Sequence, residues 1–110
     1  MGAPAQGARA GLVVVWEFRV RPNKQRVFER IYGAQCDWAK LFRSGRGYIR
    51  TEMMRDVESR DKYLTLDYWR SRHEYEEFKK KNREAYRALD EKCETLTSKE
   101  TKIGEFGTKA

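Results

Sequence analysis

The chain has 110 residues, 37% of them charged and 39% hydrophobic, and a formal net charge of +7. This length allows one domain with a modest core, and no apolar run approaches the roughly 20 residues that cross a bilayer. Residues 1–11 lack the apolar segment of a secretory signal, so we expect them to be a disordered leader. Acidic residues are interleaved with the basic ones, as on solvated helix faces, which argues against nucleic-acid binding.

The two cysteines, Cys36 and Cys93, lie far apart in the sequence, and His73 is the only histidine. This set provides neither a disulfide framework nor a zinc site. It fits a reducing compartment. We therefore expect a cytoplasmic protein without a metal.

The first half of the chain predicts three strands and a helix. Residues 12–20 (LVVVWEFRV) fill one alternating face completely with apolar side chains and form the clearest strand. A helix is expected between residues 24 and 43, where Gly33 allows a break. Strands at 48–55 and 63–69 are separated by the polar turn VESRDK and should form a hairpin.

The second half predicts one long helix and a closing strand. Ser71 and Glu74 match a capping box, so the helix should begin there, and its apolar stripe continues to residue 96. A short strand is expected at 101–106. Residues 107–110 should be a tail.

The order β-α-β-β-α-β is the split plan of ferredoxin-like folds, an α+β class with a four-stranded antiparallel sheet and helices on one face. The second face of that sheet is also apolar, because it carries Val13 and Val15 from the first strand and Leu64 and Leu66 from the third. The chain has no third layer to cover it. We therefore expect a homodimer in which two sheets pack face to face.

Four segments together carry a family resemblance, and they span residues 12–106. They are VVVWEFRVRPNKQRVFE, GYIRTEMMRD, YLTLDYWRSRHEYEEF and AYRALDEKCETLTSKETKIGEF. The most recognisable element is a W-x-S-x-x-x-Y-x-x-F pattern at Trp69, Ser71, Tyr75 and Phe78. The chain resembles the antibiotic biosynthesis monooxygenase (ABM) domain family, of the dimeric α+β barrel class.

The resemblance implies a dimer whose sheets pack into a barrel, with a ligand cleft in each subunit between sheet and helices. Characterised members oxidise polycyclic aromatic substrates with O₂ and need no metal or flavin. Relatives degrade haem, and others isomerise or cyclise small molecules, so the fold alone does not choose a reaction.

Three residues are candidates for catalysis. Trp69 falls where the monooxygenases have a tryptophan in the substrate cleft, and the alternative is a core side chain. Asn82 interrupts an apolar stripe and needs a hydrogen-bond partner, which a ligand, a water or the backbone of a helix break could supply. Asp67 could act as a base if burial raised its pKa, or it could pair with an arginine.

Five residues are candidates for substrate binding. Arg50 could hold an anionic oxygen of a substrate, or lie exposed. The other four are aromatic and could line the cleft or fill the core: Tyr32, Trp38, Phe78 and Tyr86. Because Asn82 and Tyr86 share a helix face, we expect them to border a common cavity with Trp69.

Haem is an unfavoured ligand. His73 sits in the first helical turn, where exposure is usual, whereas haem-degrading relatives carry a histidine deeper in that helix and an asparagine in the first strand. We therefore expect no cofactor, and a cofactor-independent monooxygenase acting on aromatic or polyketide-like substrates. The alternative is a non-catalytic homodimeric binding module for a hydrophobic small molecule, in which the cleft would be almost wholly apolar.

Overall fold

The computed structural model describes residues 10–33 and 37–109. Residues 1–9 of the expected leader and Cys36 lie outside the described residues. The elements, in chain order, are β1 (Leu12–Val20), α2 (Gln25–Tyr32), α3 (Asp37–Phe42), β2 (Tyr48–Arg55), β3 (Lys62–Trp69), α4 (Arg72–Lys81), α5 (Arg83–Cys93), the 3-10 turn η1 (Glu94–Leu96) and β4 (Thr97–Gly107).

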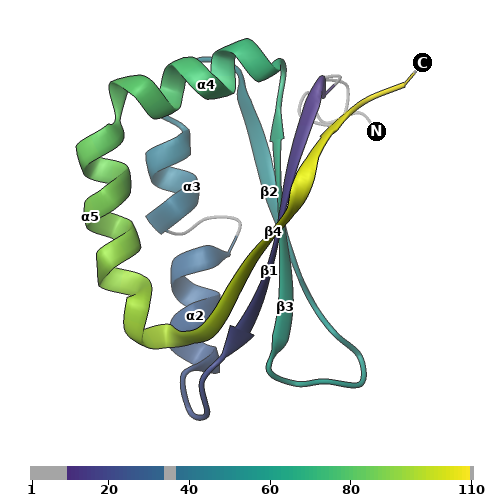
Figure 1. The fold of residues 1–110 in the computed structure, drawn as a ribbon, viewed down its shortest axis with the longest axis vertical. Helices are drawn as coiled ribbons and strands as arrows, with labels where there is room; N and C mark the ends of the chain where they lie inside the picture. The colour runs from purple at the N-terminus through teal and green to yellow at the C-terminus, as the bar shows by residue number, and fades with distance from the viewer. Residues whose placement is uncertain (1–9, 34–36, 110) are drawn as a thin grey trace.

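The four strands form one antiparallel sheet in the order β2-β3-β1-β4. All the helices cover the same face of this sheet, as Figure 1 shows with the sheet seen nearly edge-on. This arrangement confirms the predicted ferredoxin-like α+β fold. No helix in the described part of the chain is long and apolar enough to span a membrane.

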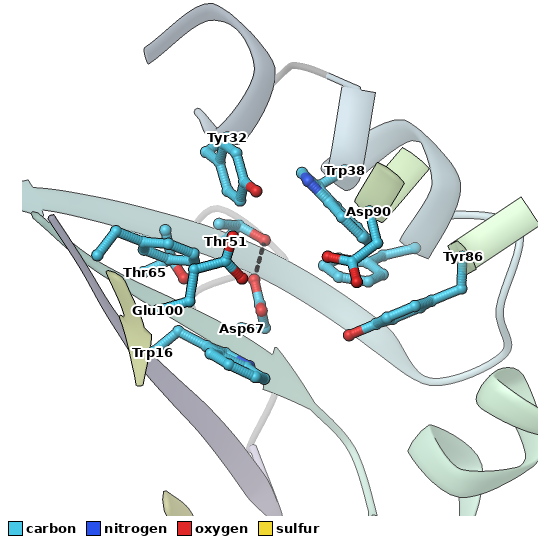
Figure 2. A pocket seen from close by; sticks show the side chains of 11 residues that line it. Trp16, Tyr32, Trp38, Thr51, Thr65, Asp67, Tyr86, Asp90 and Glu100 are labelled. Atoms are coloured by element: carbon cyan, nitrogen blue, oxygen red, sulfur yellow. Dashed lines mark hydrogen bonds between the residues drawn. The ribbon is translucent and has the colours of Figure 1, made fainter. Parts of the chain in front are cut away.

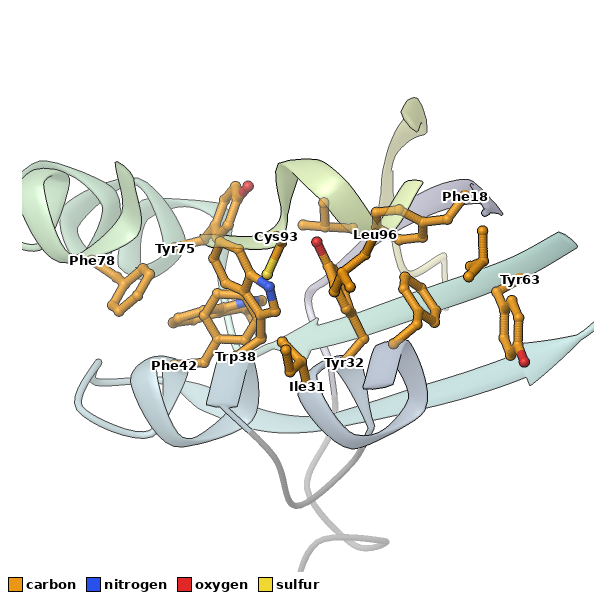
Figure 3. Packing of buried hydrophobic residues seen from close by; sticks show 14 of the residues in the cluster. Phe18, Ile31, Tyr32, Trp38, Phe42, Tyr63, Tyr75, Phe78, Cys93 and Leu96 are labelled. Carbon is orange, nitrogen blue, oxygen red and sulfur yellow. The ribbon is translucent and has the colours of Figure 1, made fainter. Parts of the chain in front are cut away.

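The core lies between the sheet and the helices, and it is rich in aromatic rings (Figure 3). Strand alternation explains its composition, since every second residue of β1 and β3 points toward the helices. In β3 these inward residues are Tyr63, Thr65, Asp67 and Trp69, all buried. Two of the four are polar. That is unusual for the inward face of a central strand and locates the candidate site.

Two elements differ from the sequence prediction. The long second helix is divided into α4 and α5 at Asn82, and the two parts run in clearly different directions (Figure 1). The last strand begins at Thr97 instead of residue 101, because residues 97–100 pair with the end of β1. The sheet also extends past the expected domain bounds, because Gly11 N–H donates to Trp69 O at 2.9 Å and Gly107 belongs to β4.

The Ser71 cap predicted at the start of the second helix is present. The hydroxyl of Ser71 accepts from Glu74 N–H at 3.1 Å and donates to the Glu74 carboxylate at 3.2 Å. Arg70 pairs with the same carboxylate at 2.6 Å. These contacts fix the corner where β3 passes into α4.

The sheet face turned away from the helices is apolar along its centre. Val15 of β1 lies opposite Leu66 of β3. Three further apolar side chains on the sheet are about half exposed: Met54 at 49%, Ile103 at 47% and Phe106 at 51%. A single chain therefore leaves an uncovered hydrophobic surface on this side.

Candidate active site

A cavity of about 110 Å³ opens between the sheet and the helices (Figure 2). Its residues come from every strand and from three helices, so only the folded chain brings them together. The lining residues are Trp16, Phe18, Tyr32, Trp38, Phe42, Thr51, Thr65, Asp67, Tyr86, Asp90 and Glu100.

The sheet supplies the polar floor of the cavity. Thr51 of β2 lies opposite Asp67 of β3, and Thr65 of β3 lies opposite Trp16 of β1. Side chains of residues directly opposite in antiparallel strands project to the same face. The register therefore places two threonines and a carboxyl group beneath the aromatic walls.

Asp67 is the buried carboxyl group of the cavity. It is only 7% exposed, and Thr51 Oγ1 donates to its Oδ1 at 2.7 Å. Thr51 Oγ1 also lies 2.7 Å from the Tyr48 hydroxyl. Because the single hydroxyl proton of threonine goes to Asp67, Tyr48 must be the donor in that second bond. Burial raises the pKa of Asp67 from 3.8 to about 7, against a smaller lowering effect of the Thr51 hydrogen bond.

Two further carboxylates, Asp90 of α5 and Glu100 of β4, are exposed residues that line the outer part of the cavity. Figure 2 shows both of them and Asp67 directed toward the space beside the Tyr86 hydroxyl. Burial raises the pKa of Tyr86 to about 12, and the negative charges of all three carboxylates add to the effect. The cavity is therefore strongly acidic in electrostatic character.

Aromatic rings form the walls. Trp38 packs edge-to-face on Tyr86, with ring centroids 4.9 Å apart, and Tyr32 lies 4.8 Å from Phe18. Trp38 is 7% exposed, and its indole N–H faces the Tyr32 hydroxyl and the Cys93 thiol.

Four of the eight predicted site residues line this cavity: Tyr32, Trp38, Asp67 and Tyr86. Of the three predicted catalytic residues, only Asp67 does so. Trp69 is fully buried behind Phe42, with its ring between Tyr48, Tyr75 and Phe78. Phe78 belongs to the same packed cluster, so both aromatic residues occupy the core position that was their alternative interpretation.

Asn82 satisfies its amide at the helix junction. It ends α4 and precedes α5, and its Nδ2 donates to Phe78 O at 3.0 Å. This is the helix-break alternative. The common cavity expected for Trp69, Asn82 and Tyr86 is not formed, since only Tyr86 lines the cavity.

Arg50 lies on the opposite face of the sheet from the cavity. Its guanidinium stacks over the Tyr68 ring at 4.0 Å and pairs with Glu52 at 3.5 Å. His73 is exposed in the first turn of α4, as expected. Among residues 10–33 and 37–109, no three His, Cys, Asp or Glu side chains are grouped as metal ligands.

Sequence reasoning missed seven lining residues: Trp16, Phe18, Phe42, Thr51, Thr65, Asp90 and Glu100. One signal was available, because Thr65 and Asp67 occupy the inward phase of a strand whose other inward residues are large aromatics. Polar side chains at such positions indicate a cavity. Asp90 and Glu100 gave no such signal, since each lies among other charged residues.

The fold is an α+β ferredoxin-like fold with a cavity between the sheet and the helices. The antibiotic biosynthesis monooxygenase family model matches residues 11–91, and the chain belongs to this family. No curated protein matches it in sequence.

Several solved structures share the fold. A mutant form of SnoaB, described as a cofactor-independent oxygenase from Streptomyces nogalater, is 14% identical, with a TM-score of 0.72 over 93% of this chain and 96% of that one. A conserved protein from Methanosarcina mazei Go1 is 16% identical, with a TM-score of 0.68 over 93% and 96%. A dimeric ferredoxin-like protein from an uncultured marine organism is 12% identical, with a TM-score of 0.67 over 94% and 91%. At these identities the likeness concerns the fold alone.

Proposed function

We propose that the chain is a small-molecule enzyme that oxidises an aromatic or polyketide-like substrate with O₂, without a metal or flavin, and that Asp67 is its general base. One observation carries the proposal: a buried carboxyl group lies against an aromatic cavity and has a pKa of about 7. A general base works best when its pKa is near the working pH. The family match and the likeness to a cofactor-independent oxygenase agree with this chemistry.

The proposed reaction begins when ionised Asp67 removes a proton from a phenol or from an activated C–H group. The resulting electron-rich anion reduces O₂. For a methylene flanked by aromatic rings, the balance is R₂CH₂ + O₂ → R₂C=O + H₂O, so the substrate supplies all the electrons. The hydroxyls of Tyr48 and Thr51 form a chain of donors to Asp67 and stabilise its ionised form.

The size of the cavity limits what it can enclose. A closed apolar cavity of about 150 Å³ takes up benzene, so about 110 Å³ has room for at most one ring. A polycyclic substrate would insert one ring beside Asp67 and leave the others at the mouth, near Asp90 and Glu100.

The alternative class is a non-catalytic binding module for a hydrophobic small molecule. It would require an almost wholly apolar cavity. Instead, Asp67, Thr51 and Thr65 converge on one region of the floor, and Tyr86 presents its hydroxyl from the opposite wall. This convergence of polar groups favours a catalytic site over simple storage of an apolar ligand.

The proposed protein is a homodimer joined through the apolar sheet faces. The exposed Met54, Ile103 and Phe106 and the central Val15 and Leu66 would be covered by the same surface of a second copy. The dimeric ferredoxin-like neighbour has a related fold. In this arrangement the cavities lie on the outer, helical sides of the two sheets.

The test is O₂ consumption with anthrone, whose methylene is acidic and whose product, anthraquinone, is followed by absorbance. Wild type should exceed the spontaneous rate. Asp67→Asn should return to that rate, because the amide retains an acceptor oxygen for Thr51 but cannot take up a proton. Asp61→Asn, a matched change in the turn far from the cavity, should behave as wild type. Equal rates for wild type and Asp67→Asn would contradict the role of Asp67.

A further inference from the structure

The charge of the cavity is opposite to that of the chain. The sequence has 24 Lys and Arg residues against 17 Asp and Glu residues. Nevertheless, the described lining contains three carboxyl groups, those of Asp67, Asp90 and Glu100, and no Lys or Arg. A lining with the average composition of this chain would contain more basic than acidic side chains.

No basic side chain of the described chain pairs with these carboxyl groups. Within the described part of the chain, none of the three forms a salt bridge. The hydrogen bonds to them come from hydroxyls, Thr51 to Asp67 at 2.7 Å and Thr97 to Glu100 at 3.0 Å. Burial raises the pKa of Glu100, and repulsion from Asp90 and Glu94 adds a smaller effect in the same direction. The mouth of the cavity therefore has uncompensated negative charge.

The aromatic walls of the cavity suit a cationic ligand, as does the negative charge at its mouth. Trp16, Trp38 and Tyr86 present aromatic faces or edges around the cavity (Figure 2). Aromatic faces attract cations, and tryptophan does so most strongly. The carboxylates of the described residues are not grouped for metal chelation, so an organic cation fits better than a metal ion.

We propose that the cavity binds a molecule with a cationic nitrogen, either a protonated amine or an alkylammonium group, attached to an aromatic ring. The ring lies inside beside Asp67, and the cation lies at the mouth between Asp90, Glu100 and the indole walls. This inference rests on the proposed function in one respect, because it names the substrate class of the same cavity.

The test compares three one-ring probes of nearly equal shape: benzylammonium, benzyl alcohol and benzoate. Binding is followed by NMR through the three indole N–H signals, since the chain has three tryptophans. The signals of Trp16 and Trp38, which line the cavity, should move, and that of the core residue Trp69 should not. Benzylammonium should bind on the order of tenfold more tightly than benzyl alcohol, and benzoate should bind most weakly.

Variants identify the source of the preference. Asp90→Asn combined with Glu100→Gln should remove most of the advantage of benzylammonium while leaving the affinity for benzyl alcohol unchanged. Both residues are exposed, so the fold should tolerate the changes. Glu91→Gln, the same loss of charge at a neighbouring exposed position of α5 outside the lining, should keep the full preference.

The outcomes separate the two proposals. If benzyl alcohol binds as tightly as benzylammonium, or the double variant keeps the preference, the cation proposal is overturned while the monooxygenase proposal stands. If none of the probes moves the Trp16 and Trp38 signals, the cavity is not a ligand site and both proposals fail. Binding of benzylammonium by wild type and by Asp67→Asn, without O₂ consumption by either protein on any C–H acid, would uphold cation binding and refute the monooxygenase proposal.

Discussion

Thr51 Oγ1 lies 2.7 Å from Asp67 Oδ1 and donates its only proton to it. The two residues are directly opposite each other in β2 and β3, so the sheet register fixes the bond. Burial and this hydrogen bond act on Asp67 in opposite directions. Burial raises its pKa, and the bond, which stabilises the ionised carboxylate, lowers it to a smaller extent. The value of about 7 is the balance of the two.

Thr51→Val should raise the pKa of Asp67. The substitution keeps the shape of the side chain but removes the donor, so the ionised form of Asp67 loses a bond worth about 1.5–3 kcal/mol. The pKa of Asp67 should rise from about 7 by about one to two units, since 1.36 kcal/mol corresponds to one unit. A pH titration followed by the carboxyl ¹³C signal of Asp67 measures it. Thr51→Ser, which keeps a hydroxyl, is the control. An unchanged or lower pKa in the valine variant would contradict the assignment.

Asp67→Asn should stabilise the protein relative to wild type. This gain in stability should be larger at neutral and alkaline pH than at acidic pH. Between pH 3.8 and about 7 the unfolded chain has ionised Asp67 while the folded protein keeps the proton. The contribution of Asp67 to wild-type stability therefore falls by up to about 1.4 kcal/mol per pH unit over this window, and this loss is complete above pH 7. Asparagine has no such loss.

Urea unfolding of both proteins at fixed concentration, from pH 4 to pH 8.5, measures this difference. The free energy of unfolding of the variant minus that of wild type should increase with pH and level off above about 7. A difference that is constant, or that decreases with pH, would show that Asp67 ionises freely in the folded protein. In that case Asp67 would lack the raised pKa on which its proposed role as general base depends.

The fold could be predicted because its signals are local and repeated. Alternation in 12–20 set the first strand to the residue, since burial on one face enforces a period of two. The polar turn VESRDK set the strands at 48–55 and 63–69 on either side of it nearly to the residue. The capping box at Ser71 and Glu74 set the start of α4. The closing strand was less certain from sequence because residues 97–100 are polar and belong to the sheet only through pairing with β1.

The cavity was harder to predict because its parts are distant in sequence. Trp69 was singled out for the resemblance and Asn82 for breaking an apolar stripe. The Trp69 ring packs in the core, and the Asn82 amide bonds to the backbone of the helix junction. Asp90 and Glu100 come to the same mouth because the chain turns back through η1 from α5 into β4. The spacing of these residues in the sequence does not predict that they lie close together in the fold.

Asn82→Ala should affect stability and leave ligand binding unchanged. Its side-chain amide donates to Phe78 O across the junction of α4 and α5, so its removal should cost about 1 kcal/mol of folding free energy. Because Asn82 does not line the cavity, the affinity for benzylammonium should not change. Tyr86→Phe is the matched comparison within α5, since it alters the cavity and should change that affinity. Loss of binding by Asn82→Ala at an unchanged melting temperature would restore Asn82 as a site residue.

Leu66→Lys should convert a dimer into a folded monomer. Leu66 lies on β3, a central strand, opposite Val15, and its side chain points away from the cavity into the apolar sheet face. A stable interface on this face should bury roughly 1,200 Å² or more, and a lysine at its centre would leave an unpaired charge in each half. Light scattering at micromolar concentration should give twice the 13.1 kDa chain mass for wild type and the single mass for the variant. Ala88→Lys, on the exposed surface of α5, should remain dimeric. A monomeric wild type, or a Leu66→Lys protein that keeps the dimer mass, would rule out pairing through this sheet face.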